Sequence, residues 1–226
     1  MKEEGKLNMN IKTLSMTIAA GSLFATGAMA DYAGLGHEVS YNDDGAWTLR
    51  LYVNFTAATD ELDAVFGDAE NSLSIDTDGN FYQNAFGGPT SADINPALYD
   101  AFPSLMNDSW VTIGLEDNVG NNMLNIGIDW TDFEAGGGIF SDNGTWFATP
   151  DDPQVLAGAD LRVLVGQFTM LDVGSHVYGV LNIQGKEGDF VTFQVRDIAF
   201  YYPLPPAPGA IALLGLAGIA SRRRRK

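Results

Sequence analysis

Apolar and polar side chains alternate along several segments of the chain. The clearest segment is 47–55, where Leu49 and Val53 lie on one side of an alternation and Thr48 and Asn54 on the other. A period of two predicts a strand with one buried face. Similar segments span residues 110–116, 123–130, 161–171, 176–184 and 190–201, with shorter ones at 62–66, 72–76 and 145–148. Successive short strands without intervening helices predict an all-β, antiparallel β-sandwich over residues 31–202, either jelly-roll-like or immunoglobulin-like.

Turn residues separate these segments. Asn143-Gly144 stands between the apolar pairs 139–140 and 146–147, which predicts a tight hairpin, because this dipeptide accepts the positive φ angles of such turns. Helical structure is expected only as a turn or two near Asn95 to Phe102, where Pro96 suits the first helical position. The pattern contains no repeat and no linker that would divide the domain.

The N-terminal 30 residues have the three regions of a secretory signal peptide in order. Lys12 provides a positive charge, an apolar run extends over residues 14–25, and Ala28 and Ala30 form the small-x-small pattern that signal peptidase cleaves. Met9 is a plausible true start, because Glu3 and Glu4 do not fit the positive region. The sequence therefore predicts export of a mature chain that begins near residue 31.

The C-terminal 24 residues, 203–226, also have three parts. A proline cluster ends the fold, an apolar run from Gly209 to Ala220 follows, and a cluster of cations closes the chain. Such a run is about 20 Å long as a helix, shorter than the roughly 30 Å hydrocarbon core of a bilayer.

This ending resembles the PEP-CTERM sorting signal of Gram-negative-type bacteria, with Pro-Ala-Pro in place of Pro-Glu-Pro, a form similar to that of planctomycete-like bacteria. The resemblance rests on Pro206, Ala207, Pro208, Arg222, Arg223, Arg224 and Arg225. It implies transient insertion of a short hydrophobic helix into the inner membrane and cleavage by an exosortase-type enzyme. It further implies delivery to the cell surface or the exopolysaccharide matrix, and it implies nothing about the role of the middle domain.

The composition of the chain narrows the range of functions that the middle domain can have. The chain is 46% hydrophobic and 11% aromatic, which favours a packed core over disorder, and it has no Cys, which excludes disulfides and cysteine nucleophiles. Residues 31–221 contain four basic and 27 acidic residues, a net charge of −23. Nucleic acid is therefore excluded as a partner, because its phosphates require a basic face.

The long segment 79–109 lacks a strand pattern and is rich in aromatic residues. Loops of this length in compact domains are often functional, and aromatic rings can stack on sugars. The residues considered for glycan binding are Phe81, Tyr82, Phe86 and Tyr99. The alternative is that these rings belong to the core.

Oxygen-bearing side chains at alternate positions suggest a calcium site at Asp76, Asp78 and Asn80. The twelfth position of an EF-hand loop would be Gly87 rather than Glu, so an EF-hand is excluded and a looser site remains. The alternative is that the acidic residues keep an exported protein soluble.

The sequence gives little evidence for a catalytic site. His37 and His176 lie outside any known catalytic motif, and Glu134, beside Trp130 and Phe133, is the most suggestive carboxylate for glycoside hydrolysis. The sequence therefore favours a non-enzymatic protein of the cell surface or extracellular matrix. A calcium-assisted carbohydrate-binding module and a polysaccharide hydrolase remain as alternatives.

Overall fold

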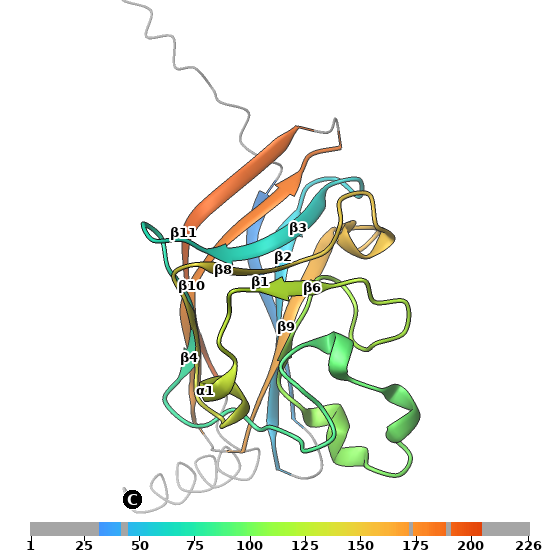
Figure 1. Ribbon diagram of the computed structural model, residues 1–226, viewed down its shortest axis with the longest axis vertical. Coiled ribbons are helices and arrows are strands. Elements are labelled where there is room, and N and C mark those ends of the chain that lie inside the picture. The colour runs from blue at the N-terminus through green and yellow to red at the C-terminus, as the bar shows by residue number, and fades with distance from the viewer. Residues whose placement is uncertain (1–31, 42–44, 172–173, 189–190, 205–226) are drawn as a thin grey trace, which may run out of the picture.

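The computed structural model describes residues 32–41, 45–171, 174–188 and 191–204. They form two antiparallel β-sheets, which confirms the predicted all-β class (Figure 1). The predicted signal peptide and the predicted C-terminal helix lie outside the described residues.

The smaller sheet has four strands in the order β1-β2-β9-β5. They are β1 (Tyr32–Tyr41), β2 (Trp47–Phe55), β9 (Arg162–Met170) and β5 (Trp110–Val111). The larger sheet follows the order β6-β8-β3-β10-β4-β7, with β11 on the other edge of β10. Its strands are β3 (Glu61–Gly67), β4 (Leu73–Thr77), β6 (Leu124–Ile126), β7 (Ile139–Ser141), β8 (Gly144–Phe147), β10 (His176–Lys186) and β11 (Thr192–Pro203).

The predicted hairpin at Asn143-Gly144 is wrong. β7 pairs with β4 and β8 pairs with β3, and both β3 and β4 lie along the same edge of β10. The segment 139–147 is thus one interrupted strand that continues in a single direction, and neither Asn143 nor Gly144 has a positive φ. This course allows Ile139 and Trp146 to be buried in the same core, one on each side of the interruption.

The main core lies between the two sheets. It combines residues of β2 and β9, such as Leu51 and Phe168, with residues of the larger sheet, such as Val65 and Leu181. Trp146 is fully buried, and its indole Nε1 donates to the Thr112 carbonyl at 3.0 Å. The alternation in the sequence therefore predicted the buried face of β2 correctly.

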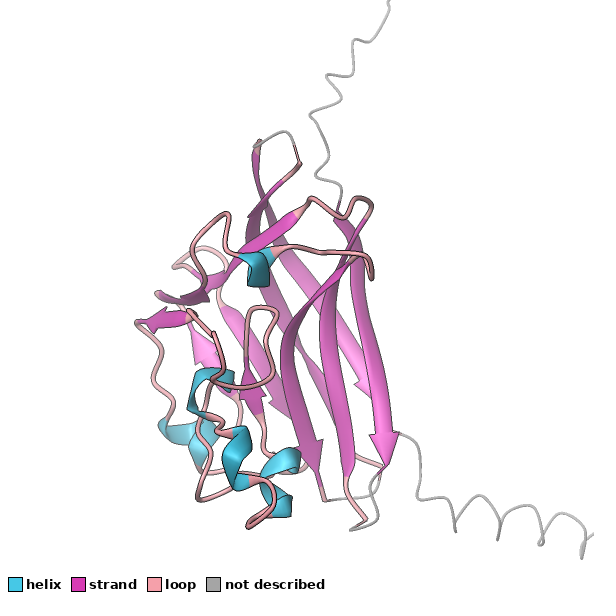
Figure 2. Ribbon diagram, turned by 90° about the vertical axis from the view of Figure 1, so that its right-hand side faces the viewer, coloured by secondary structure: helices cyan, strands magenta, loops and turns pink. Residues whose placement is uncertain are grey.

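Three short 3₁₀ helices pack against part of the outer face of the smaller sheet, on the side of β9 and β5 (Figure 2). They are η1 (Ser91–Asp93), η2 (Pro96–Leu98) and η3 (Pro103–Asn107). Ile94 and Leu105 from this segment pack with Tyr52, Trp110 and Leu164 in a second cluster. The turn expected near Pro96 is confirmed as η2, whose first backbone groups are capped by the side chain of Asn95.

Two predicted strands are shorter than expected, and one strand was missed. The segments 110–116 and 123–130 contribute only β5 and β6, and Gly114 takes a φ of 80° that turns the chain away from β9. β1 is half exposed along its length, so its sequence carries no regular alternation.

The remaining helical turns are α1 (Thr131–Glu134) and η4 (Pro153–Val155). Within the described residues, no helix is both long and apolar enough to cross a bilayer.

Candidate functional site

The four aromatic residues considered for glycan binding do not share one surface. Phe81 is 2% exposed, and its ring centroid lies 5.7 Å from that of Phe133 and 5.4 Å from that of Phe168. Phe86 is exposed and stacks on Phe102 at 3.9 Å. Phe81 is thus a core residue, as the alternative interpretation of this segment expected.

The two tyrosines of this set are half-buried. The backbone N–H of Tyr82 donates to the Thr169 carbonyl at 2.7 Å, which ties the segment to β9. Tyr99 packs against the second cluster, and burial raises the pKa of its hydroxyl. Both residues therefore help to attach segment 79–109 to the sheet.

The residues considered for calcium lie at the surface, at the end of β4. The carboxylate of Asp78 accepts from the backbone N–H of His176 at 2.6 Å and lies 2.7 Å from its ring Nδ1. These contacts hold the pKa of Asp78 below its usual range. Asp76 accepts from the Thr77 backbone N–H, and Asn80 is exposed. In the described part of the chain, no three His, Asp or Glu side chains are grouped as metal ligands.

The remaining candidates are Glu134, the carboxylate considered for hydrolysis, and the residues of the signal peptide and the sorting signal. Glu134 is exposed at the end of α1, whereas Phe133 beside it is fully buried, so the aromatic residues do not enclose the carboxylate. Ala28, Ala30, the Pro206 to Pro208 motif and the four arginines 222–225 lie outside the described residues.

A groove crosses the outer face of the larger sheet. One hollow has a volume of about 290 Å³ and is lined by Asp63, Phe66, Phe147 and Gln184, among others. A second hollow of about 340 Å³ extends toward Ile126 and Asn143. Both hollows are lined by Phe66 and Thr145, so they adjoin each other across β3 and β8, and the two together are called the groove.

A buried carboxyl group lies at one end of this groove. Leu62 pairs with Gly185 and Ala64 pairs with Gln184, so Asp63 is the extra residue of a β-bulge. Asp63 is 4% exposed, and its Oδ1 has no hydrogen-bond partner among the described residues. Burial first, and then the neighbouring Glu61, raise the pKa of Asp63 to about 7.

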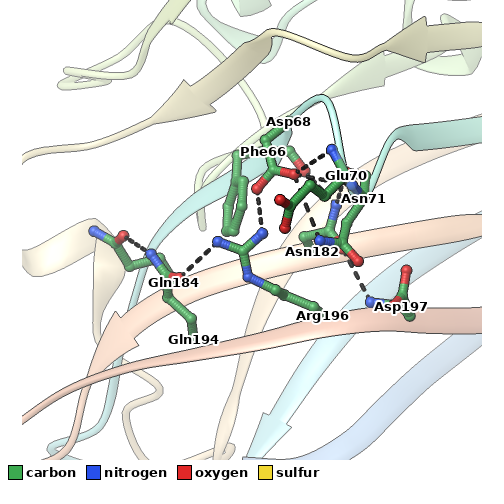
Figure 3. A network of polar contacts seen from close by, with 9 residues as sticks. All are labelled: Phe66, Asp68, Glu70, Asn71, Asn182, Gln184, Gln194, Arg196 and Asp197. Atoms are coloured by element: carbon green, nitrogen blue, oxygen red, sulfur yellow. Dashed lines mark hydrogen bonds and ion pairs between the residues drawn. The ribbon is translucent and has the colours of Figure 1, made fainter.

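Polar contacts hold Phe66 and Gln184, which line the groove together with Asp63. Figure 3 shows the guanidinium group of Arg196 next to Phe66 and Asp68, with Gln194 and Gln184 to one side. The guanidinium carbon of Arg196 lies 5.1 Å from the centre of the Phe66 ring, and its nitrogens bind Asp68 and the side-chain oxygen of Gln194. Gln194 in turn donates to Gln184 Oε1 at 2.7 Å.

Neither a protein-family model nor a curated protein nor a solved structure matches the chain. Its function is therefore inferred from its own residues.

A second buried carboxyl group, that of Asp108, lies within segment 79–109. Asp108 is fully buried, and its Oδ1 accepts from the backbone N–H groups of Asn84 and Ser109 at 2.7 and 3.1 Å. Its Oδ2 has no hydrogen bond within the described residues. Burial outweighs the lowering effect of the backbone N–H groups of Asn84, Ser109 and Gly88, and it raises the pKa of this carboxyl to about 7. Asp108 lines neither hollow of the groove, and its contacts tie together the backbone of its own loop.

Sequence reasoning missed Asp63 and the groove. The available signal was Glu61-Leu62-Asp63, two carboxylates flanking a core residue in a strand, since acidic side chains are depleted in strands and seldom buried. That signal does not identify the groove, because Phe147, Gln184 and Arg196 come from distant segments.

Proposed function

We propose that the chain is an exported, non-enzymatic domain of the bacterial cell surface or extracellular matrix, sorted and processed through its C-terminal signal. The three-part sequence of residues 203–226 carries this proposal. Signal peptidase, an exosortase-type enzyme and exopolysaccharide are the partners it implies, with transient insertion into the inner membrane. In finer detail, the sandwich is proposed to be jelly-roll-like or immunoglobulin-like.

The position of Leu204, close to the proposed processing motif, supports the proposal. Leu204 is 4% exposed, belongs to the main core, and donates its backbone N–H to the Ser175 carbonyl. The Pro206 to Pro208 motif begins two residues later. A processing enzyme that cuts at this motif would therefore leave the buried Leu204 in the mature chain.

The charge distribution also supports an exported, soluble domain that does not bind nucleic acid. Each basic residue of the described chain contacts at least one carboxylate: Arg50 with Glu116, Arg162 with Glu38, Arg196 with Asp68, and Lys186 with Glu61 and Asp151. The excess of acidic residues keeps the surface strongly negative, which favours solubility and repels phosphates.

The two alternatives have weaker support. A calcium-assisted carbohydrate module at residues 76–109 would lose Phe81 to the core, and the Asp78 carboxylate would have to leave His176. A hydrolase centred on Glu134 would use a solvated carboxylate without the apolar surroundings that raise the pKa of a general acid.

The test compares surface localisation of the full chain with a chain ending at Leu204. The cut follows Leu204 because removal of this buried residue would also disturb the fold. A second variant changes Pro206 and Pro208 to Ala, and Pro153→Ala, at the exposed start of η4, is the matched control.

We expect the truncated and the Pro206/Pro208 chains to lose surface attachment or processing, while Pro153→Ala behaves like the wild type. The measurements are cell fractionation and the mass of the mature chain. If the chain that ends at Leu204 reaches the same surface location in the same amount, the sorting proposal is wrong.

A further inference from the structure

We propose that the groove on the outer face of the larger sheet binds an uncharged pyranose oligosaccharide, with Phe66 and Phe147 against the sugar faces and Asp63 and Gln184 bonded to hydroxyl groups. This inference is independent of the sorting proposal, since either one can fail without the other.

The shape of the groove suits an extended chain rather than a single small molecule. Its two hollows of about 290 and 340 Å³ meet at Phe66 and Thr145, and together they extend from Pro150 to Gly127. A linear ligand that lies across β3 and β8 contacts both hollows.

The aromatic residues provide apolar walls that are already in place. Phe66 and Phe147 are half-buried, so one part of each ring packs on the protein and the other faces the groove. Arg196, held by Asp68 and Gln194, fixes the Phe66 ring. A ring that is held before binding loses little conformational freedom when a sugar packs on it.

Asp63 provides an acceptor atom, Oδ1, that has no hydrogen bond in the described chain, while the carboxyl as a whole is bonded to the neighbouring Glu61. A buried polar atom without a hydrogen bond destabilises the folded chain. The side chain lines the first hollow but Oδ1 is closed to solvent, so a ligand hydroxyl group supplies the missing bond when the Asp63 side chain turns toward that hollow.

Gln184 provides a donor at the same hollow. Its Oε1 accepts from Gln194, which orients the amide, and within the described chain the structure gives no acceptor for its Nε2 hydrogens. A donor and an acceptor beside aromatic rings match a sugar, which presents hydroxyl groups at its rim and C–H groups on its faces.

The charge around the groove selects an uncharged ligand. Glu61 lies beside Asp63, and Asp68 and Glu70 line the hollow next to Arg196. Lys186 and Arg196 are already paired with carboxylates. An anionic polysaccharide would therefore be repelled, whereas a neutral one would not.

The test is isothermal titration of the full chain, in a detergent without a sugar head group, with hexasaccharides of cellulose, xylan, mannan and chitin. A hexasaccharide of alginate serves as the anionic comparison. The variants are Asp63→Ala and Phe66→Ala, and Phe140→Ala is the matched control, because Phe140 is an exposed phenylalanine on β7 that lines neither hollow. Circular dichroism verifies that each variant is folded, and Gln184→Ala replaces Phe66→Ala if the latter does not fold.

We expect at least one neutral hexasaccharide to bind, and each groove substitution to weaken its binding about tenfold. Phe140→Ala should leave the affinity unchanged. The proposal is overturned if no neutral hexasaccharide binds the folded chain, if alginate binds as tightly, or if the groove variants bind like the wild type. Those results would indicate a groove that serves another class of partner, such as a protein.

Discussion

The replacement Asp108→Asn removes a buried titrating group without changing the shape of the side chain. The new side chain would retain Oδ1 as the acceptor for the backbone N–H groups of Asn84 and Ser109. Its amide nitrogen would replace the carboxylate Oδ2, which has no hydrogen bond in the described chain, although the backbone N–H of Gly88 also acts on this carboxyl. The new amide donors add a cost that does not depend on pH, so the change of the stability difference with pH isolates the burial of the titrating carboxyl within segment 79–109.

The pKa of Asp108 gives both the sign and the size of the effect. Well below its ordinary pKa of 3.8, the group is protonated in the folded and the unfolded chain, so it has no net effect on stability. Between 3.8 and the folded value of about 7, only the folded chain keeps the proton, so stability falls as the pH rises. At about 1.4 kcal/mol for each pH unit, the total loss is about 4 kcal/mol above pH 7.

The assay is urea denaturation of the wild type and the variant at pH values from about 3 to about 8.5, a range that spans both pKa values. We expect the free energy of unfolding of Asp108→Asn, relative to the wild type, to rise by about 4 kcal/mol from the lowest pH to the highest. Asp63, which titrates in the same range, is present in both chains and cancels. Asp100→Asn, at an exposed position, is the control and should show no such trend. A difference that stays constant across this range would refute the reasoning.

Three further substitutions test the packing. Gly87→Ala would place a Cβ atom within 1.7 Å of Asp108 Oδ2, so we expect a loss of about 2 kcal/mol in thermal denaturation, and wild-type stability would contradict the close approach. Trp146→Phe removes the bond to the buried Thr112 carbonyl and should cost about 2 kcal/mol in urea denaturation, whereas a loss near zero would mean that this bond is unimportant. Arg50→Ala breaks a partly exposed pair with Glu116 and should cost less than about 1 kcal/mol in the same assay, and a larger loss would show that this pair supports the fold.

The alternation of side chains was enough to locate the long strands. β2, β9 and β10 fall within one or two residues of the predicted segments, because the side chains that enter the main core recur at every second position, even though β2 and β9 are also largely buried on their other face. The proline turn at Pro96 was equally local, since it depends on the geometry of the residue itself. The sequence alone also supplies the two chain ends on which the sorting proposal rests.

Other features depended on residues that are far apart in the chain. β1 lies at an edge of its sheet and shows no alternation, and the segment 139–147 became an interrupted strand because β3 and β4 lie end to end along β10. Phe81 entered the core because Phe133 and Phe168 surround it.

The groove illustrates this limit most clearly. Asp63 is a bulge residue only because β3 pairs with Gly185 and Gln184, more than one hundred positions away in the sequence. Its burial, its raised pKa and its place beside Phe66 all follow from that pairing. The sequence by itself determined which segments form strands and which residues carry charge. Only the tertiary structure decided which of those charges are buried and which aromatic rings they meet, because burial depends on the partners that distant strands provide.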